Sequence, residues 1–239
     1  PQIYDLSRSF LLEIPMLTTC VWSIYFLIKS RFFTNTKFTF LFSLSFAVAV
    51  LTKWTSIYIL IIPVMLNIYI AVRKYRNHSL FLNGTLAAGL LLLIAAPWYL
   101  VNLNTLLIST KINSIGEIGD PITMISWNNL SYYAVALINN QVGLLLVLTA
   151  IIDIYCTLNT KNNMAIKIAL FLQIIYIYFV FTFINNKDPR YTAGLLLPLA
   201  VFCGYGTSYY IENKKIIYLS INTITLIYLV IIHAIFTIN

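Results

Sequence analysis

Charged residues are scarce in this chain of 239 residues, and their scarcity decides its class. Only 9% of the residues are charged, whereas a soluble domain carries about 25%. So few charges cannot cover a surface that faces water. Because 60% of the residues are hydrophobic, and apolar runs of about 20 residues recur along the chain, we expect most of the surface to face lipid.

Other absences narrow the class further. The apolar–polar alternation of strands is missing, which argues against an outer-membrane barrel. No GxxxxGK[ST] or GxGxxG motif indicates a nucleotide site, and no HExxH motif or cysteine cluster indicates a metal site. The net charge of +8 is spread in small groups between the apolar runs, so it predicts membrane topology rather than a nucleic-acid partner.

The apolar runs predict an all-α, polytopic integral membrane protein made of a single transmembrane domain over residues 1–239. We expect about eight transmembrane helices, with both chain ends on the non-cytoplasmic side. The predicted spans are 12–29, 38–52, 54–72, 81–101, 139–157, 164–184, 191–211 and 216–237.

The second and third spans depend on a break at Thr52–Thr55, because residues 38–72 are otherwise almost continuously apolar. One straight helix of that length would run about 52 Å, which is too long for a hydrocarbon core of about 30 Å. It would also bury Lys53 at the membrane centre, at a cost of roughly 3 kcal/mol or more. We therefore predict a tight helical hairpin with Lys53 at its tip.

The basic residues support this topology, because the hairpin divides them ten against five between the two faces. By the positive-inside rule, the richer face is cytoplasmic. The cytoplasmic set is Lys29, Arg31, Lys37, Arg73, Lys74, Arg76, Lys161, Lys167, Lys214 and Lys215, and the outer set is Arg8, Lys53, Lys111, Lys187 and Arg190.

The only long connection in this topology is the outer loop at about 102–138. Its second half, Ile122 to Leu137, carries aromatic and aliphatic residues, including Trp127, Tyr132 and Tyr133. We expect that half to form a helix lying in the membrane interface.

Acidic residues gather on the predicted outer face, and only Asp153 and Glu212 fall inside. Ionisable groups at helix ends on one face indicate a binding pocket, although loop charges in contact with water explain the pattern equally well. The outer candidates are Glu13 near the start of the first span, Lys53 at the hairpin tip, and Lys187, Asp188 and Arg190 in the turn before the seventh span. Lys53 and Arg190 suit a phosphate group.

Four segments then occur in a recognisable order: Ser7-Arg8 with Glu13-Ile14-Pro15-Met16, Leu51-Thr52-Lys53-Trp54, Ala96-Pro97-Trp98-Tyr99, and Lys187-Asp188-Pro189-Arg190-Tyr191 with Leu197-Pro198-Leu199. In order and spacing they resemble the membrane glycosyltransferases of the GT-C fold. The similarity is to the dolichyl-phosphate-mannose protein mannosyltransferases and the bacterial lipid A aminoarabinose transferase.

The resemblance implies transfer of a sugar from a polyprenyl-phosphate donor to a protein, lipid or glycan acceptor, on the outer face of a bacterial plasma membrane. It makes Glu13, where the family usually has an aspartate, the catalytic candidate, near the acceptor or an optional divalent metal ion. Lys53 and Arg190 would neutralise the carrier phosphate as it leaves. Arg8, Lys187 and Asp188 are the further substrate-binding candidates.

One departure limits the expected activity. The family's main catalytic acid lies in a first outer loop, after an earlier span, and this chain starts at Pro1 without a methionine. We expect the chain to be a fragment that lacks this acid and is inactive alone.

Two other functions stay open. A transporter or flippase for a lipid-linked or small anionic substrate fits the spans interrupted at Pro63 and Pro198, but no charge lies clearly at mid-depth and no half repeats the other. A non-catalytic membrane subunit would need no clustered outer charges.

Overall fold

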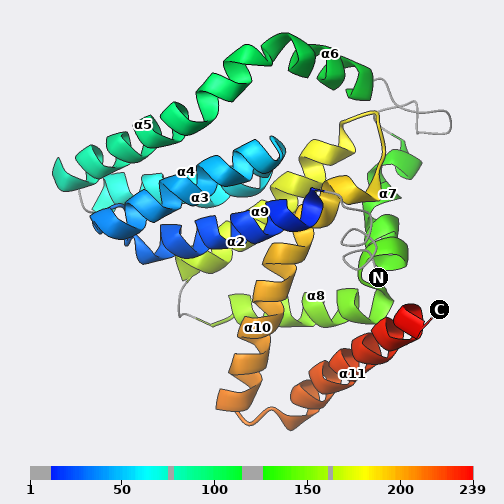
Figure 1. Cartoon of the computed structure of the whole chain (residues 1–239). Coiled ribbons are helices and arrows are strands. Elements are labelled where there is room, and N and C mark those ends of the chain that lie inside the picture. The colour runs from blue at the N-terminus through cyan, green and yellow to red at the C-terminus, as the bar shows by residue number, and fades with distance from the viewer. Residues whose placement is uncertain (1–11, 75–77, 115–125, 161–163, 239) are drawn as a thin grey trace. The chain divides into compact units, whose positions relative to one another are not determined.

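The computed structural model describes residues 12–74, 78–114, 126–160 and 164–238 (Figure 1). Within these ranges every regular element is a helix and none is a strand, which confirms the predicted all-α class. The candidate Arg8 lies outside the described residues, as does the start of the predicted interfacial helix.

The elements follow the chain as a simple succession of helices. They are α2 (Glu13–Lys29), α3 (Thr36–Thr52), α4 (Ser56–Lys74), α5 (His78–Val101), α6 (Leu103–Ser114), α7 (Trp127–Ala136), the π-helical turn η1 (Leu137–Gln141), α8 (Leu144–Leu158), α9 (Met164–Thr182), the 3-10 helix η2 (Pro189–Leu195), α10 (Leu196–Glu212) and α11 (Ile216–Ile238).

A helix is found at each of the eight predicted span positions, but fewer helices meet the length and hydropathy of a full span. In the described ranges four do so: Ser56–Arg73, Leu80–Val101, Met164–Thr182 and Pro189–Glu212. The pair Trp127–Gln141 and Leu144–Leu158, bent by 115°, makes a fifth if it is counted as one broken span. The long apolar helices fit an integral membrane protein, whereas eight spans and GT-C likeness remain predictions.

The described helices form two compact units. The N-terminal unit comprises residues 12–114 together with 184–187, and the C-terminal unit comprises residues 126–183 and 188–238, less the gaps named above.

In the N-terminal unit, α3 packs against α2 and α5, and α2 also packs against α4. The core at one end of these helices is an aromatic and aliphatic cluster in which the Phe33 and Phe42 rings lie 6.0 Å apart at 62°. Edge-on ring pairs of this kind contribute about 1 kcal/mol beyond the area they bury. The buried members are Leu27, Phe33, Phe42, Ala71 and Leu80.

The turn between α2 and α3 is left-handed, with positive φ angles at three successive residues: Arg31 (48°), Phe32 (60°) and Phe33 (62°). Residues other than glycine adopt this conformation at a cost, so the surroundings must hold it. The Asn83 side chain from α5 donates to the Phe33 carbonyl oxygen at 2.8 Å, and the Asn35 amide donates to the Ser30 carbonyl oxygen at 2.9 Å.

The predicted break at Thr52–Thr55 is present. α3 ends at Thr52, Lys53 is extended (φ −156°, ψ 121°), and the Ser56 amide donates to the Lys53 carbonyl oxygen at 2.9 Å as α4 begins. Beyond the break α4 runs back in the opposite direction to α3 (Figure 1). The 17 residues of α3 span about 26 Å, so this arm of the hairpin is short for a full bilayer.

In the C-terminal unit, α8 and α11 pack against α10, and η1 joins α7 to α8. The predicted span at 139–157 is replaced by a helix that begins only at Leu144. The reason is local, because the π-helical turn ends at Gln141 and Gly143 has a φ of +88°, which glycine adopts without strain. The chain therefore bends sharply before α8.

The predicted outer loop is more structured than expected. Its first half contains α6, where the sequence predicted only a loop, and its second half contains α7. The Ser126 side chain caps α7 by accepting a hydrogen bond from the Asn129 amide at 3.2 Å. A helix is thus confirmed at Trp127–Ala136, while its position in a membrane interface stays a prediction.

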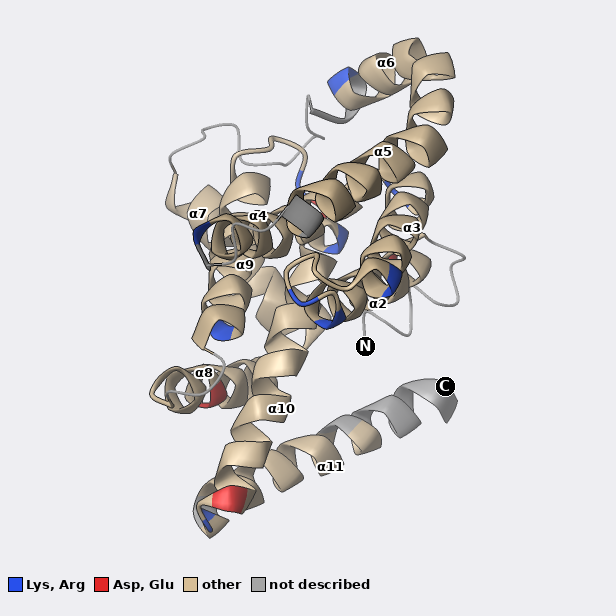
Figure 2. Ribbon diagram, turned by 90° about the vertical axis from the view of Figure 1, so that its left-hand side faces the viewer, with Lys and Arg blue, Asp and Glu red and all other residues tan. Residues whose placement is uncertain are grey.

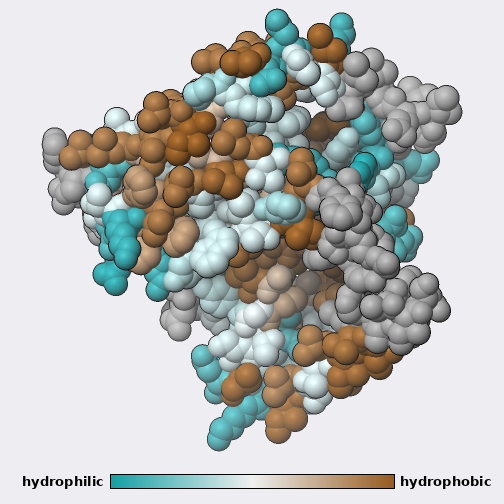
Figure 3. Space-filling view, in the orientation of Figure 1, coloured by the Kyte–Doolittle hydropathy of each residue, from teal (hydrophilic) through white to brown (hydrophobic). Residues whose placement is uncertain are grey.

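The surface is apolar along the helices, as a lipid-facing surface requires. Leu93 and Val101 in α5 are 74% and 84% exposed. Hydrophobic side chains cover much of α5 in Figure 3. Figure 2 shows that charged residues are few and widely separated along the helices.

Candidate functional site

The structure brings together two predicted site residues from separate segments, Glu13 and Lys53. The Lys53 ammonium donates to the Glu13 Oε1 atom at 2.5 Å. The Glu13 side chain is 3% exposed and the Lys53 side chain 24% exposed. The pair therefore has a buried carboxylate and a lysine that reaches solvent.

Local structure explains how these two side chains meet. Glu13 is the first residue of α2, where the positive end of the helix dipole favours an acid, but no side chain caps this helix end. Lys53 follows the last residue of α3, and its extended backbone turns the chain toward α4. The packing of α2 against α3 and α4 places the two residues side by side.

Two further contacts support the same turn. The Tyr99 hydroxyl donates to the Val50 carbonyl oxygen at 2.6 Å, so a residue of the predicted Ala96–Tyr99 segment fixes the end of α3. The Thr55 hydroxyl lies 3.5 Å from the Met16 sulfur. Two of the four segments that carry the family resemblance thus contact each other through Lys53 and Glu13, and Tyr99 of a third segment contacts Val50, next to the Lys53 segment.

The Glu13 carboxylate is only half satisfied. Its second oxygen, Oε2, is buried and has no hydrogen-bond partner. A buried charge without its counterion is costly, so Lys53 is the main stabiliser of this carboxylate. Conversely, the carboxylate fixes the lysine head, which would otherwise move freely on its four-carbon stem.

Two further predicted site residues, Asp188 and Arg190, pair with each other in the C-terminal unit. Asp188 caps η2, accepting from the Arg190 amide at 2.8 Å and from the Arg190 Nε atom at 2.6 Å. The guanidinium also forms an ion pair with the carboxylate through Nη2, and its side chain is 43% exposed. Pro189 at the first helical position makes this a rigid turn.

Gln141, at the end of η1, was not predicted as a site residue. Its side chain binds the turn that contains Asp188 and Arg190. Its Nε2 atom donates to the Pro189 carbonyl oxygen at 2.5 Å and to the Thr192 hydroxyl at 2.8 Å. The Tyr191 ring stacks on Phe181 of α9, with ring centroids 5.7 Å apart. No local signal marks Gln141, because its role depends on a segment 48 residues away.

The remaining candidates differ in accessibility. Lys187 is buried, with 8% of its surface exposed, and is the last residue grouped with the N-terminal unit. Lys53 and Arg190 each have a carboxylate partner, so neither is an isolated cation. The prediction that Glu13, Lys53 and Arg190 share one vestibule remains a prediction.

The residues present do not fit a divalent metal ion. Calcium takes six to eight oxygen ligands, and magnesium is held by one or two free carboxylates together with waters and substrate phosphates. Across the described ranges no group of three His, Cys, Asp or Glu side chains gathers, and the acid at the candidate site, Glu13, is already paired with a lysine. We therefore derive no chemical step through a metal.

A buried acid lies in the C-terminal unit. Asp153, which the sequence analysis grouped with the cytoplasmic charges, is fully buried (0% exposed) in α8, ten residues into a helix of 15, while its membrane side stays a prediction. Lys167 is buried too, and its ammonium donates to the Thr157 carbonyl oxygen at 2.8 Å at the end of α8. Lys167 therefore caps a helix end rather than serving as a solvated anchor.

Comparisons of the chain with family models, with curated proteins and with solved structures gave no match.

Proposed function

We propose that the chain is part of a GT-C type membrane glycosyltransferase, which moves a sugar from a polyprenyl-phosphate donor to a protein, lipid or glycan acceptor on the extracytoplasmic face. The observation that carries the proposal is the ion pair between Lys53 and Glu13, which joins two of the family-like segments at the ends of apolar helices. An isoprenoid carrier suits such surroundings, because its tail needs apolar helices and its phosphate needs a cation at their ends.

In this proposal Lys53 binds the carrier phosphate. An ammonium has three donors, and one of them is used by Glu13. The bond between the anomeric carbon and the carrier phosphate oxygen breaks, and its electron pair passes to the phosphate. An acceptor oxygen forms the new bond to that carbon from the opposite side, and its proton passes to a base that the resemblance places in an outer loop. Lys53 stabilises the charge that develops on the phosphate.

Glu13 then has a different role from the one expected. The resemblance suggested an acid near the acceptor, but its carboxylate is almost fully buried and holds the Lys53 ammonium. We assign Glu13 the positioning of Lys53. Arg190, with an exposed guanidinium on the rigid turn at Asp188, is the second candidate for contact with phosphate.

Binding of the carrier tests this proposal directly, because it needs no catalytic base. The purified chain in nanodiscs is titrated with a polyprenyl phosphate, and with the polyprenol of equal length. We expect the phosphate to bind at least about tenfold more tightly than the alcohol, and Lys53→Ala to remove most of the difference. Lys37→Ala, at an exposed lysine on the predicted cytoplasmic face, is the matched control and should leave it unchanged. Equal binding of phosphate and alcohol by the unmodified chain contradicts the proposal.

The second candidate function is a transporter or flippase, which two observations favour. Transporters use broken helices, and Trp127–Gln141 meets Leu144–Leu158 at a bend of 115°. They also use buried ionisable groups in spans, such as Asp153. Movement of the carrier across liposomes that contain the chain favours the transporter. Selective binding of the carrier phosphate without such movement favours the enzyme.

A further inference from the structure

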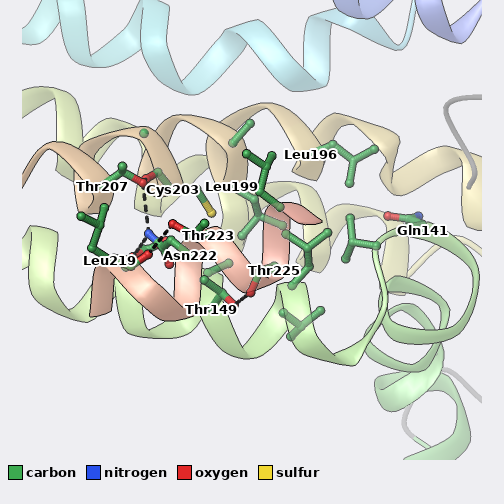
Figure 4. Close-up of a pocket in the computed structure, with 18 residues that line it drawn as sticks. Gln141, Thr149, Leu196, Leu199, Cys203, Thr207, Leu219, Asn222, Thr223 and Thr225 are labelled. Carbon is green, nitrogen blue, oxygen red and sulfur yellow. Dashed lines mark hydrogen bonds between the residues drawn. The ribbon is translucent and has the colours of Figure 1, made fainter. Parts of the chain in front are cut away.

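The C-terminal unit contains a cavity of about 560 Å³ between α8, α10 and α11, and its wall is largely aliphatic (Figure 4). Thr207, Cys203 and Asn222 lie at one end, whereas Leu196 and Gln141 lie toward the other. The volume is in the usual range for small-molecule sites. A cavity with apolar walls and a cluster of polar groups at one end suits an amphiphile.

The polar end is built around Asp153, a wall residue that is completely buried. Its Oδ1 atom accepts from the Asn222 amide at 3.4 Å. The Tyr210 hydroxyl and the Cys203 thiol lie close enough to interact with the carboxyl group, but neither forms a well-aligned hydrogen bond with it. The Asp153 Oδ2 atom and the Tyr210 hydroxyl are therefore both buried without a hydrogen-bond partner. Burying a carboxyl oxygen without a hydrogen bond costs free energy, so a ligand that donates a hydrogen bond to this atom would stabilise the folded protein.

The Asn222 amide and the threonine hydroxyls that line this end already donate within the protein. The Asn222 Nδ2 atom donates to Thr207 Oγ1 at 3.0 Å as well as to Asp153, and the Thr207 hydroxyl donates to the Cys203 carbonyl oxygen at 2.8 Å. The Thr223 hydroxyl donates to the Leu219 carbonyl oxygen at 2.9 Å. The polar atoms that remain available to a ligand are mainly hydrogen-bond acceptors. They suit a ligand group that only donates hydrogen bonds.

The charge around the cavity indicates which hydrogen-bond-donating group would bind there. No basic residue is among those that line the cavity, and the neutral neighbours of Asp153 cannot balance a carboxylate. A phosphate or carboxylate ligand would be repelled. A protonated amine carries three donors and the balancing charge.

The fold shows that the carboxyl group is held close to α10. A Cβ atom built on Gly206 would lie 2.3 Å from Asp153 Oδ1, so only glycine leaves room there for the acid. The carboxyl group is thus fixed against one helix of the cavity wall.

We propose that this cavity binds a lipophilic amine, with its ammonium group on the Asp153 carboxylate and its hydrocarbon chain along the aliphatic wall. The inference does not depend on the proposed transferase function. It assigns the C-terminal unit a ligand site selective for cationic amphiphiles over neutral and anionic ones.

Photocrosslinking tests this site with the whole chain in nanodiscs of zwitterionic lipid. The probes are dodecylamine and dodecanol, each carrying the same diazirine on its alkyl chain. Crosslinks are mapped by mass spectrometry to peptides of α8, α10 and α11, and normalised to α5, whose exposed leucines report general contact with dissolved probe. We expect the amine to label the cavity peptides about tenfold more than the alcohol does.

Variants identify the group responsible. Asp153→Asn keeps the shape and removes the charge, so the preference for the amine should disappear. Glu212→Gln, the same change at an exposed acid of α10, should leave it intact. Equal normalised labelling by amine and alcohol in the unmodified chain overturns the proposal, even if Asp153→Asn fails to fold. An amine preference that persists in folded Asp153→Asn overturns it as well.

Discussion

Glu13 and Lys53 are 40 positions apart in the sequence, yet the Lys53 ammonium lies 2.5 Å from the Glu13 carboxylate. One partner begins the first described helix and the other occupies the break between α3 and α4. The contact ties the predicted hairpin tip to α2. It also places a cation at the end of apolar helices, where a lipid-linked phosphate needs one.

The Lys53–Glu13 pair predicts non-additive changes in stability. Lys53→Met leaves the buried Glu13 charge without its partner, and should lower the free energy of unfolding by about 1–3 kcal/mol, less than for a fully buried pair because Lys53 is partly exposed. Glu13→Gln combined with Lys53→Met should recover most of this loss. Thermal unfolding of the purified variants measures the effect. A double variant less stable than Lys53→Met would contradict the assigned pairing.

The same variants separate structure from function. The double variant should be stable but should lose most of its preference for polyprenyl phosphate over polyprenol, because the Lys53 ammonium is gone. Lys53→Arg with Glu13 retained should keep part of the preference, since a guanidinium also binds phosphate. Titration of carrier binding tests both, and full binding by the double variant would remove Lys53 from the site.

The contacts of Arg190 with Asp188 predict that carrier binding depends on the shape of the Arg190 side chain as well as on its charge. Arg190→Lys keeps the charge but loses the planar group that contacts Asp188 through Nε and Nη2. If Arg190 contacts phosphate, Arg190→Lys should weaken carrier binding several-fold, and Arg190→Ala should weaken it further. Lys37→Ala again serves as the control. Unchanged binding in Arg190→Ala would limit this turn to a structural role.

Replacing Gly206 by alanine should cause a steric clash with Asp153, and the same change at Gly204 in α10 serves as the control. Gly206→Ala puts a methyl group within 2.8 Å of three Asp153 side-chain atoms, and should destabilise the chain by about 1–3 kcal/mol. At Gly204 nothing lies within 4 Å of an added Cβ atom, so Gly204→Ala should stabilise α10 by up to about 1 kcal/mol. Unfolding temperatures should move in opposite directions, and a shared direction would argue against the close approach of α8 and α10.

Local patterns predicted much of the fold. The apolar runs located the helices, and the cost of burying Lys53 located the break between α3 and α4. The late start of α8 was missed, although the isolated Gly143 marked it. α6 was missed because its short stretch has no strong apolar face.

The long-range features were beyond a single sequence. Asp153 was assigned to the cytoplasmic charges because it lies near the end of an apolar run, and its burial depends on Gly206 and Asn222 in later helices. Gln141 was missed for the same kind of reason. For Glu13 and Lys53 the sequence predicted a shared site, but their direct pairing depends on how α2 packs against the hairpin.

The central claim is that the Lys53–Glu13 pair faces the outside of the membrane, where a lipid-linked sugar would be used. Cysteine labelling in intact cells measures this most directly. Cys20, Cys156 and Cys203 are first replaced by alanine, and a single cysteine is then placed at position 53 or, as the control, at position 37. A membrane-impermeant maleimide should label position 53 in intact cells and position 37 only after the cells are opened. Labelling of position 53 solely from the cytosol would contradict the account.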